Sequence, residues 1–363
     1  MNSDTMVFLK QVYREFYFGN VESIEFPRDI QTREFGYIPF GGNMVRHLSF
    51  RSRGEAIAEI LKQSPSSIYC SNAKYESPTA PIDEKRWLGA ELIFDIDATD
   101  IPTPCKRGHD IWYCETCFAS GKLPGPSKCP KCGGPSTTFH GTCESCISAA
   151  KNHAQRVTNF LTEDFGVEYD NLRPYFSGNR GFHIHVQDNR FNTLGQLSRV
   201  EVSDFLMGRS LPPNRKMVSE IQIRQGQGNG IAGEGWIRRI AKHVWNKQVG
   251  YSGTLEKLVS DAISMQIALI DSSVTTDVHR IFRLAGSLHG NTGLRKMHIK
   301  SIDSFDPQID PIVLSGKPVT LKVNFHPKFR LKGEEFGPFK SQMVELPTYA
   351  AVSILTRGLG EVV

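Results

Sequence analysis

The chain has 363 residues, of which 39% are hydrophobic, 22% charged and 10% aromatic. This balance excludes a disordered chain and suits two domains, or one large core with an accessory part. No run approaches the roughly 20 apolar residues of a membrane span, and the N-terminus lacks the pattern of a signal peptide. We therefore expect a cytoplasmic protein that contacts no membrane.

The charge balance limits how the chain can contact nucleic acid. Forty-three Lys and Arg against 38 Asp and Glu give a net charge of +5, too little for a protein that binds DNA by overall charge alone. Contact with a polyanion must be local. One candidate is the tail over residues 315–332, which has no acid and five basic residues: Lys317, Lys322, Lys328, Arg330 and Lys332.

Hydrophobic periodicity predicts helices over residues 6–18, 53–63 and 144–165. Between the last two, ELIFDIDATD (91–100) has the alternation of a strand. One face carries Leu92, Phe94 and Ile96, and the other carries Ile93, Asp95 and Asp97.

RPYFSGNRGFHIHV (173–186) predicts a buried hairpin with a glycine-flanked turn, and His183 and His185 share one face of its second strand. Residues 188–267 alternate polar helical stretches with the glycine-rich RQGQGNGIAGEGW (224–236). We interpret them as an accessory segment with a mobile loop. The apolar run over 267–270 then predicts a strand that ends at Asp271, and Asp277 is placed as a helix N-cap.

Two of these segments carry residues suited to nucleotide chemistry. Asp95 and Asp97 project from the same face of a strand, and two close carboxylates favour Mg²⁺ or Mn²⁺ bound between them and phosphates. The turn SGNRG offers Ser177, Arg180 and close backbone approach, with His183 just beyond it. Each pattern alone also fits a plain turn with exposed charges.

Seven of the eight cysteines lie between Cys105 and Cys146, which indicates metal sites more than disulfides. Two C-x-x-C pairs separated by eleven residues have zinc-ribbon spacing, and they comprise Cys114, Cys117, Cys129 and Cys132. The remaining candidates are Cys105, His109, Cys143 and Cys146. His140 could replace a ligand in either metal site, but we interpret it as a surface residue.

The ordered motifs ELIFDIDATD, YFSGNRGFHIHV and VTTDVHRIFRLAGSLHGNTGL, with a cysteine cluster after the first, resemble the small catalytic subunit of the archaeal and eukaryotic type of DNA primase. REFGYIPFGGNMVRHLSF is similar to the N-terminal signature of that family. The resemblance covers roughly residues 8–300. It implies a primase catalytic fold, an α/β (α+β) core with a mixed central sheet, an inserted zinc-binding module and a helical accessory segment.

The family resemblance also implies the reaction, in which short primers are made from nucleoside triphosphates on single-stranded DNA by two-metal nucleotidyl transfer. By position, the implied Mg²⁺ or Mn²⁺ ligands are Asp95, Asp97 and Asp271. The implied nucleotide-binding residues are Ser177, Arg180, His183, Arg283 and His289. A primase large subunit is the implied partner, and the implied location is the cytoplasm at the nucleoid.

The family zinc knuckle resembles Cys-x-x-x-His followed by a C-x-x-C pair at a helix start. We therefore expect two structural zinc ions in a nested arrangement. Cys105, His109, Cys143 and Cys146 hold one ion, and the ribbon cysteines hold the other. The alternative groups Cys105, His109, Cys114 and Cys117 around one ion and the last four cysteines around the other.

Two positions depart from the family pattern. Asn291 replaces a common lysine, so a phosphate contact there must be lost, weakened or replaced, with Arg295 as one candidate. Asn179 stands where some members have a second arginine. This end of the nucleotide site therefore holds fewer cations than in those members.

The expected organisation is a core over 1–104, a zinc module over 105–146, the hairpin core over 147–187, the accessory segment over 188–267 and core completion with a basic tail over 268–363. Two other functions remain open: a zinc-ribbon module that binds nucleic acid without catalysis, and a primase-polymerase of the end-joining type. Polymer formation in a template assay separates the enzyme from the module.

Overall fold

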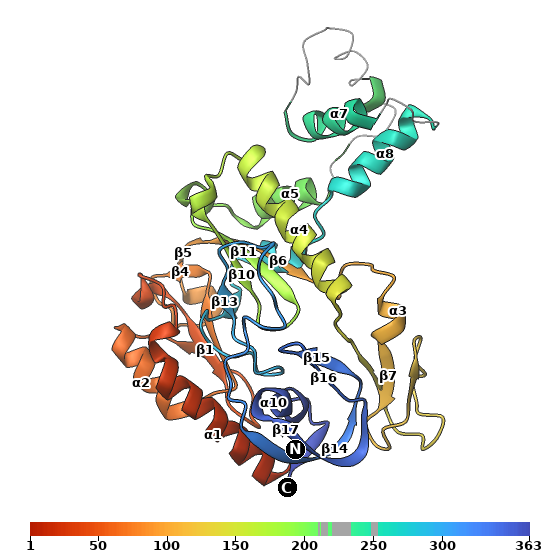
Figure 1. Cartoon of the computed structure of the whole chain (residues 1–363). Coiled ribbons are helices and arrows are strands. Elements are labelled where there is room, and N and C mark those ends of the chain that lie inside the picture. The colour runs from red at the N-terminus through yellow and green to blue at the C-terminus, as the bar shows by residue number, and fades with distance from the viewer. Residues whose placement is uncertain (210, 212–216, 220–233, 248–252) are drawn as a thin grey trace.

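The structure is a computed structural model that describes residues 1–209, 211, 217–219, 234–247 and 253–363. The two termini lie close together at one end of the molecule, and helices α7 (Gly235–Lys247) and α8 (Leu255–Gln266) project from the other end (Figure 1). Most of the glycine-rich stretch 224–236, for which the sequence predicts a mobile loop, lies outside the described residues. No helix within the described ranges is long and apolar enough to cross a membrane.

Two four-stranded sheets form the centre of the molecule, with strand orders β12-β3-β1-β2 and β13-β10-β11-β6. The first contains β1 (Phe35–Ile38), β2 (Val45–Leu48), β3 (Ser67–Ser71) and β12 (Ile281–Arg283). The second contains β6 (Leu92–Asp97), β10 (Leu172–Phe176), β11 (Gly181–Val186) and β13 (Met297–His298). The mixed α/β class is confirmed. The strands of both sheets pair antiparallel, so two antiparallel sheets stand where one mixed sheet was expected.

The alternation along β6 and β11 sorts apolar from polar side chains. Leu92, Phe94 and Ile96 are buried in the main core, on the sheet face covered by α4 (Glu144–Glu163). The opposite face carries Asp95 and Asp97. There Ile93 packs against Phe282 of β12 and Val274, so the polar face of one sheet lies against the other sheet.

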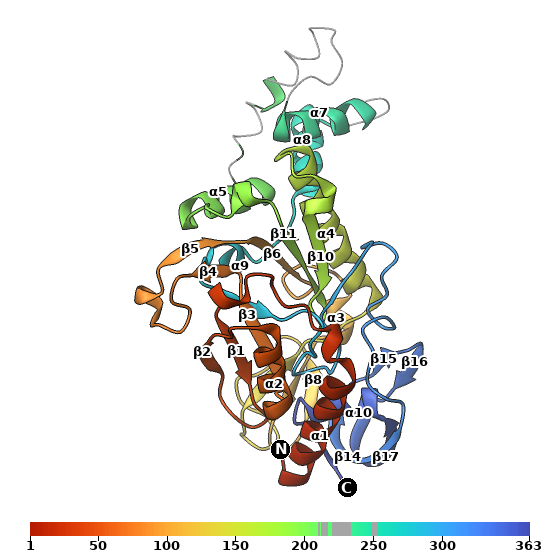
Figure 2. The ribbon, with the colours of Figure 1, turned by 90° about the vertical axis from the view of Figure 1, so that its left-hand side faces the viewer.

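Two helices support the first sheet. The predicted helices are α1 (Ser3–Asn20) and α2 (Arg53–Gln63), which begin at side-chain caps supplied by Asn2 and Ser52. Figure 2 shows both helices beside strands β1 to β3. A short hairpin of β4 (Ala73–Tyr75) and β5 (Trp87–Ala90) leads into β6.

The cysteine-rich segment forms a small unit between β6 and α4. It contains the single turn α3 (Lys106–His109) and a three-stranded sheet of β7 (Ile111–Cys114), β8 (Ser120–Lys122) and β9 (Ser136–Phe139). Aromatic contacts join it to the C-terminal region, because Tyr113 stacks on Phe325 and Phe139 meets His326 edge to face.

The basic residues predicted as a tail belong to a folded C-terminal unit. Strand β14 (Pro318–His326) lies between β17 (Phe339–Pro347) and β18 (Gly360–Val362), beside the hairpin of β15 (Phe329–Leu331) and β16 (Glu334–Phe336) and helix α10 (Thr348–Leu355). Lys328 pairs with Glu335, and Arg330 pairs with Glu144. Acids from other segments therefore neutralise part of the expected basic patch.

The segment between β11 and β12 contains helices α5 (Gln196–Leu206), α7, α8 and the short α9 (Ser272–Thr276). Two predictions here are wrong. Residues 267–270 form no strand, since their backbone groups bond instead to loop and helix partners such as Leu206. Asp271, not Asp277, is the N-cap, and Asp277 follows the last residue of α9.

Candidate active site and zinc centres

Three carboxylates converge at the end of β6. Asp95 and Asp97 share one face of the strand, and the backbone N–H of Asp271 donates to the carbonyl oxygen of Asp95 over 2.9 Å. Burial, together with the charges of Asp97 and Asp271, raises the pKa of Asp95 to about 7. The cluster carries more negative charge than its surroundings balance, so it suits divalent cations.

Asp97 is held by its own turn and by the hairpin. Its Oδ1 accepts from the N–H and Oγ1 of Thr99 at 2.8 and 2.7 Å, and from Nε of Arg180 at 3.1 Å. Arg180 therefore already lies at the carboxylate cluster, where a phosphate bound to a cation would meet it.

The hairpin turn depends on close packing against the loop that contains His289. Gly178 has φ of +89°, and a Cβ there would lie 2.9 Å from Cβ of His289. Thr292 Oγ1 donates to the Gly178 carbonyl over 2.6 Å. Ser177 Oγ accepts from the N–H groups of Asn179 and Gly181 at 3.4 and 3.2 Å, which fixes the turn.

His183 lies directly opposite Asp95 across the β6–β11 pair, with Nε2 3.4 Å from Oδ1 of Asp95. Its Nδ1 is buried without a hydrogen-bond partner. Burial holds the pKa of His183 well below its usual range, with the charge of Lys296 adding to the effect. The ring is therefore neutral at pH 7.

Arg283 and His289 enter the same region from β12 and the loop after it. Arg283 donates from Nη1 to Ser67 Oγ at 2.8 Å. His289 accepts the N–H of Asn291 at Nδ1 over 3.1 Å, and burial lowers its pKa well below the usual value. A neutral ring whose Nδ1 is an acceptor carries its proton on Nε2, so His289 offers an N–H donor.

All eight residues singled out as metal or nucleotide ligands lie on β6, in the β10–β11 hairpin, at the N-cap of α9, on β12 or in the loop after it, and contacts such as Asp97–Arg180 and Asp95–His183 link some of them. They are Asp95, Asp97, Asp271, Ser177, Arg180, His183, Arg283 and His289. The sequence did not single out Lys296, but the structure shows that it is only 1% exposed. It borders a cavity of about 170 Å³ that Arg283 and His185 also line. The sequence signal for Lys296 is weak, because a lysine between arginine and methionine reads as an exposed strand residue.

The cysteines form two separate groups. Cys105, His109, Cys143 and Cys146 make the first, and Cys114, Cys117, Cys129 and Cys132 make the second. In each group the ligand atoms lie within 4.8 Å of one another. The nested grouping is therefore the one the fold assembles, and the alternative grouping is not. All eight cysteines of the chain are free of disulfides, and His140 belongs to neither group.

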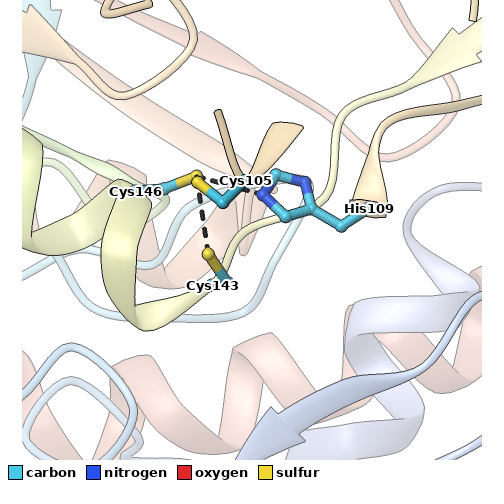
Figure 3. A group of neighbouring side chains, drawn as sticks. All are labelled: Cys105, His109, Cys143 and Cys146. Carbon is cyan, nitrogen blue, oxygen red and sulfur yellow. Dashed lines mark hydrogen bonds between the residues drawn. The ribbon is translucent and has the colours of Figure 1, made fainter. Parts of the chain in front are cut away.

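The sulfur separations fit tetrahedral zinc. In the first group (Figure 3), Sγ of Cys146 lies 3.4 Å from Sγ of Cys105, 3.8 Å from Sγ of Cys143 and 3.2 Å from Nε2 of His109. In the second, the Cys114–Cys132 and Cys117–Cys129 sulfurs are 3.5 and 3.6 Å apart. Zn–S bonds of about 2.3 Å at tetrahedral angles place sulfurs about 3.8 Å apart.

A chain of contacts links the first group to the carboxylates. Asp110 accepts from His109 Nδ1 at 2.8 Å, from His140 Nδ1 at 3.0 Å and from the N–H of Gly141 at 3.1 Å. The carbonyl of His140 accepts from Nη1 of Arg180 at 3.3 Å. Asp110 thus orients the histidine of the first cysteine group and also fixes the segment that supports Arg180. Its place directly after His109 was the sequence signal that we missed.

Comparison with known proteins finds relatives along the length of the chain. A family model described as DNA primase small subunit matches residues 139–300. The DNA primase small subunit of Nitrosopumilus maritimus is 33% identical over 374 residues, covering 100% of both chains. That of Cenarchaeum symbiosum is 34% identical and covers 99% of both chains.

Among solved structures, the polymerase domain of Mycobacterium tuberculosis ligase D in complex with DNA aligns with 82% of this chain and 83% of its own, at 12% identity and a TM-score of 0.39. The sequence relatives span the whole chain, including the carboxylates, the hairpin turn and the cysteine groups. This chain belongs to the DNA primase small subunit family.

Proposed function

We propose that the chain is the catalytic subunit of a DNA primase, which starts and extends short primers from nucleoside triphosphates on single-stranded DNA. The observation that carries the proposal is the meeting of three carboxylates, Asp95, Asp97 and Asp271, with a glycine-dependent turn that can hold phosphates. A nucleic-acid-binding module without catalysis gives those carboxylates no role.

Asp95, Asp97 and Asp271 would hold two Mg²⁺ or Mn²⁺ ions. Such ions lower the pKa of the attacking 3′-hydroxyl and neutralise the triphosphate and the leaving pyrophosphate. The raised pKa of Asp95 supports this role, because a buried cluster of like charges is unfavourable without cations.

The chain's own residues would bind and orient the triphosphate. Arg180 would release its contact with Asp97 and bind phosphate oxygens instead, since a planar guanidinium can donate two parallel hydrogen bonds to a phosphate. His289 donates from Nε2, and Arg283 adds positive charge from β12. Ser177 fixes the turn so that the backbone can approach the phosphates closely. His183, neutral beside Asp95 and with an unpartnered Nδ1, would bind the nucleotide from the β11 side of the site.

The two cysteine groups would each hold a structural zinc ion, because four protein ligands leave no open position for water activation. Family membership also supports a primase large subunit as partner and a place of action at the nucleoid. The folded C-terminal unit keeps Lys317, Lys322 and Lys332 as candidates for contact with the template.

The test is a template-directed assay with purified chain, single-stranded DNA, Mn²⁺ or Mg²⁺ and labelled nucleotides. We expect polymers whose sequence follows the template, and none from Asp97→Asn. Binding of the template without any polymer, under conditions where the large subunit is also supplied, would reject the catalytic proposal and favour the binding module.

A further inference from the structure

A cavity of about 120 Å³ lies between the hairpin turn, the zinc-bearing segment and the C-terminal unit. Asn179 and Thr292 line it on the side of the proposed nucleotide site, His140 lines it on the zinc side, and Arg357 and His326 line it from the C-terminal unit. None of its described lining residues is Asp or Glu. The cavity is therefore electropositive and opens beside the turn.

Arg357 differs from Lys328 and Arg330, the other Lys and Arg side chains that line this cavity. Its guanidinium donates from Nη1 to the carbonyl of Ser353 at 2.5 Å and lies 5.8 Å from the ring centroid of Phe139. Within the described part of the chain it makes no ion pair with a carboxylate, whereas Lys328 and Arg330 at the same cavity each have one. A partly buried guanidinium without a counter-ion is unfavourable unless a ligand supplies the negative charge.

The positive charges around the cavity act on each other. Burial, together with the charge of Arg180, lowers the pKa of Arg357 to about 10. Arg357 and Arg180 both also lower the pKa of His289. Arg357 therefore lies within electrostatic range of Arg180 and His289, so positive charge from distant parts of the sequence gathers on this side of the proposed nucleotide site and favours an anion there.

Neither Asn179, which lines the cavity, nor the exposed Asn291 supplies a positive charge at this end of the proposed nucleotide site. Arg295, the replacement considered from the sequence, does not line this cavity. It interacts electrostatically with Glu25 instead.

We propose that Arg357 binds the terminal phosphate of the incoming nucleoside triphosphate in the cavity between Asn179 and helix α10. This inference rests on the proposed function and adds a phosphate contact from the C-terminal unit. Phosphodiesters of the template have the same chemistry, and the experiment separates the two sources.

The experiment measures binding of ATP, AMP and a single-stranded oligonucleotide to the full chain by calorimetry, with Mg²⁺ present. Arg357→Gln should weaken ATP binding roughly tenfold or more, because it removes a charge-assisted phosphate contact. AMP and oligonucleotide affinities should change by less than about twofold. Arg86→Gln, which removes an equal charge from the exposed pair with Glu76, should leave all three affinities unchanged.

A second variant leaves Arg357 in place, in case its replacement prevents folding. Gln308 lines the same cavity, and Gln308→Glu adds a carboxylate of the same size that competes for Arg357, so ATP binding should again weaken while AMP binding does not. Asn179→Arg, combined with Arg357→Gln, should restore ATP affinity, which a purely structural role of Arg357 would not allow.

Unchanged ATP affinity in both Arg357→Gln and Gln308→Glu would overturn the inference. So would an equal loss for AMP and ATP, or a loss confined to the oligonucleotide, which would assign the cavity to nucleic-acid phosphates. If the wild-type chain bound no ATP at all, the proposed function would fail with it. A wild-type chain that binds ATP while the variants match it rejects this inference alone.

Discussion

At the scale of single residues, Asp271 has two separable roles. Its Oδ1 accepts from the N–H and Oγ of Ser273 at 3.0 and 2.6 Å, which caps α9, while its charge raises the pKa of Asp95. Asparagine caps a helix about as well as aspartate, but it carries no charge. A substitution can therefore remove the charge and keep the cap.

We predict that Asp271→Asn loses polymerisation by at least about a hundredfold and melts at the same or a higher temperature, because repulsion within the carboxylate cluster is relieved. Asp271→Ala should lose activity and also roughly 1 kcal/mol of stability through the missing cap. Primer extension and thermal melting measure the two effects. Asp277→Ala is the control, since the carboxylate of Asp277 accepts the N–H of His279 and is not one of the three assigned to the metals, and it should retain activity. Normal extension by Asp271→Asn would remove this residue from the metal site.

Lys296 is a buried cation that lies 5.2 Å from the ring centroid of Tyr175, and Asp95, Glu25 and Glu91 act on it electrostatically. Burial lowers its pKa to about 7, with the charge of Arg283 adding to the shift. An unfolded lysine titrates near 10.4. Between these pH values the unfolded chain binds a proton that the folded chain does not, so stability due to this site rises with pH.

Lys296→Met should therefore stabilise the protein most near pH 6.5, where the charge is unfavourable in the fold. The difference in unfolding free energy between wild type and variant should shrink toward pH 9.5, by at most about 1.4 kcal/mol per pH unit. Denaturant melts at several pH values measure it. A difference independent of pH would show that Lys296 keeps its charge when buried.

At the scale of elements, the two cysteine groups have unequal connections to the site. The first group spans α3 and the start of α4, and it reaches Arg180 through Asp110 and the carbonyl of His140. The second group closes the end of the β7–β8–β9 sheet, which meets the rest of the molecule through aromatic packing. Loss of the metal from the first group should therefore affect the proposed nucleotide site more than loss of the metal from the second group.

We predict about two zinc ions per wild-type chain, by elemental analysis of protein purified without added metal. Cys129→Ser should retain one zinc and most of the ATP affinity. Cys143→Ser should also retain one zinc, but it should weaken ATP binding because Arg180 loses its support. Equal ATP affinity in the two variants would contradict the link through Asp110.

Asp110→Asn tests that link without removing a ligand. It weakens the hydrogen bond that orients His109, so zinc should be lost to a chelator roughly 10–100 times more readily from the first group. The release of zinc can be followed with a metal indicator dye. Asp100→Asn serves as the matched control, because Asp100 is outside both cysteine groups.

At the scale of the whole molecule, the two ends of the chain hold the C-terminal unit against the first sheet. Strand β18 pairs with β14, and the N–H of Val362 donates to Thr5 Oγ1 of α1 over 3.0 Å. Tyr13 of the same helix donates to the carbonyl of His289 over 3.0 Å. Helix α1 thus connects the terminal strand to the loop of the proposed nucleotide site.

Deletion of residues 360–363 should lower the melting temperature by several degrees, because it removes three ladder pairs and exposes β14. It should also weaken ATP binding, since Arg357 lies just before the deleted strand. Thermal melting and calorimetry measure the two losses. Val363→Ala, at an exposed terminal residue, is the control and should change neither. If the truncated protein melts at a lower temperature yet binds ATP normally, then α10 alone positions Arg357.

The sequence by itself determined the local features. Alternation along 92–97 placed Asp95 and Asp97 on one face, helical periodicity located α1, α2 and α4, and glycine with polar residues marked the hairpin turn. C-x-x-C spacing also indicated the ribbon. These features depend on residues close in the chain, so periodicity and spacing are enough to predict them.

Only the tertiary structure decided which distant residues meet. The apolar run before Asp271 read as a strand, but its neighbours in space supply its hydrogen bonds, so it remains irregular. The basic stretch over 315–332 is predicted as a tail from the sequence. In the structure its residues 318–326 form strand β14, which pairs with β17 and β18. The local sequence signal for Lys296 and Asp110 is weak and that for Arg357 is absent, because the importance of these residues comes mainly from burial and from partners that sequence spacing does not encode.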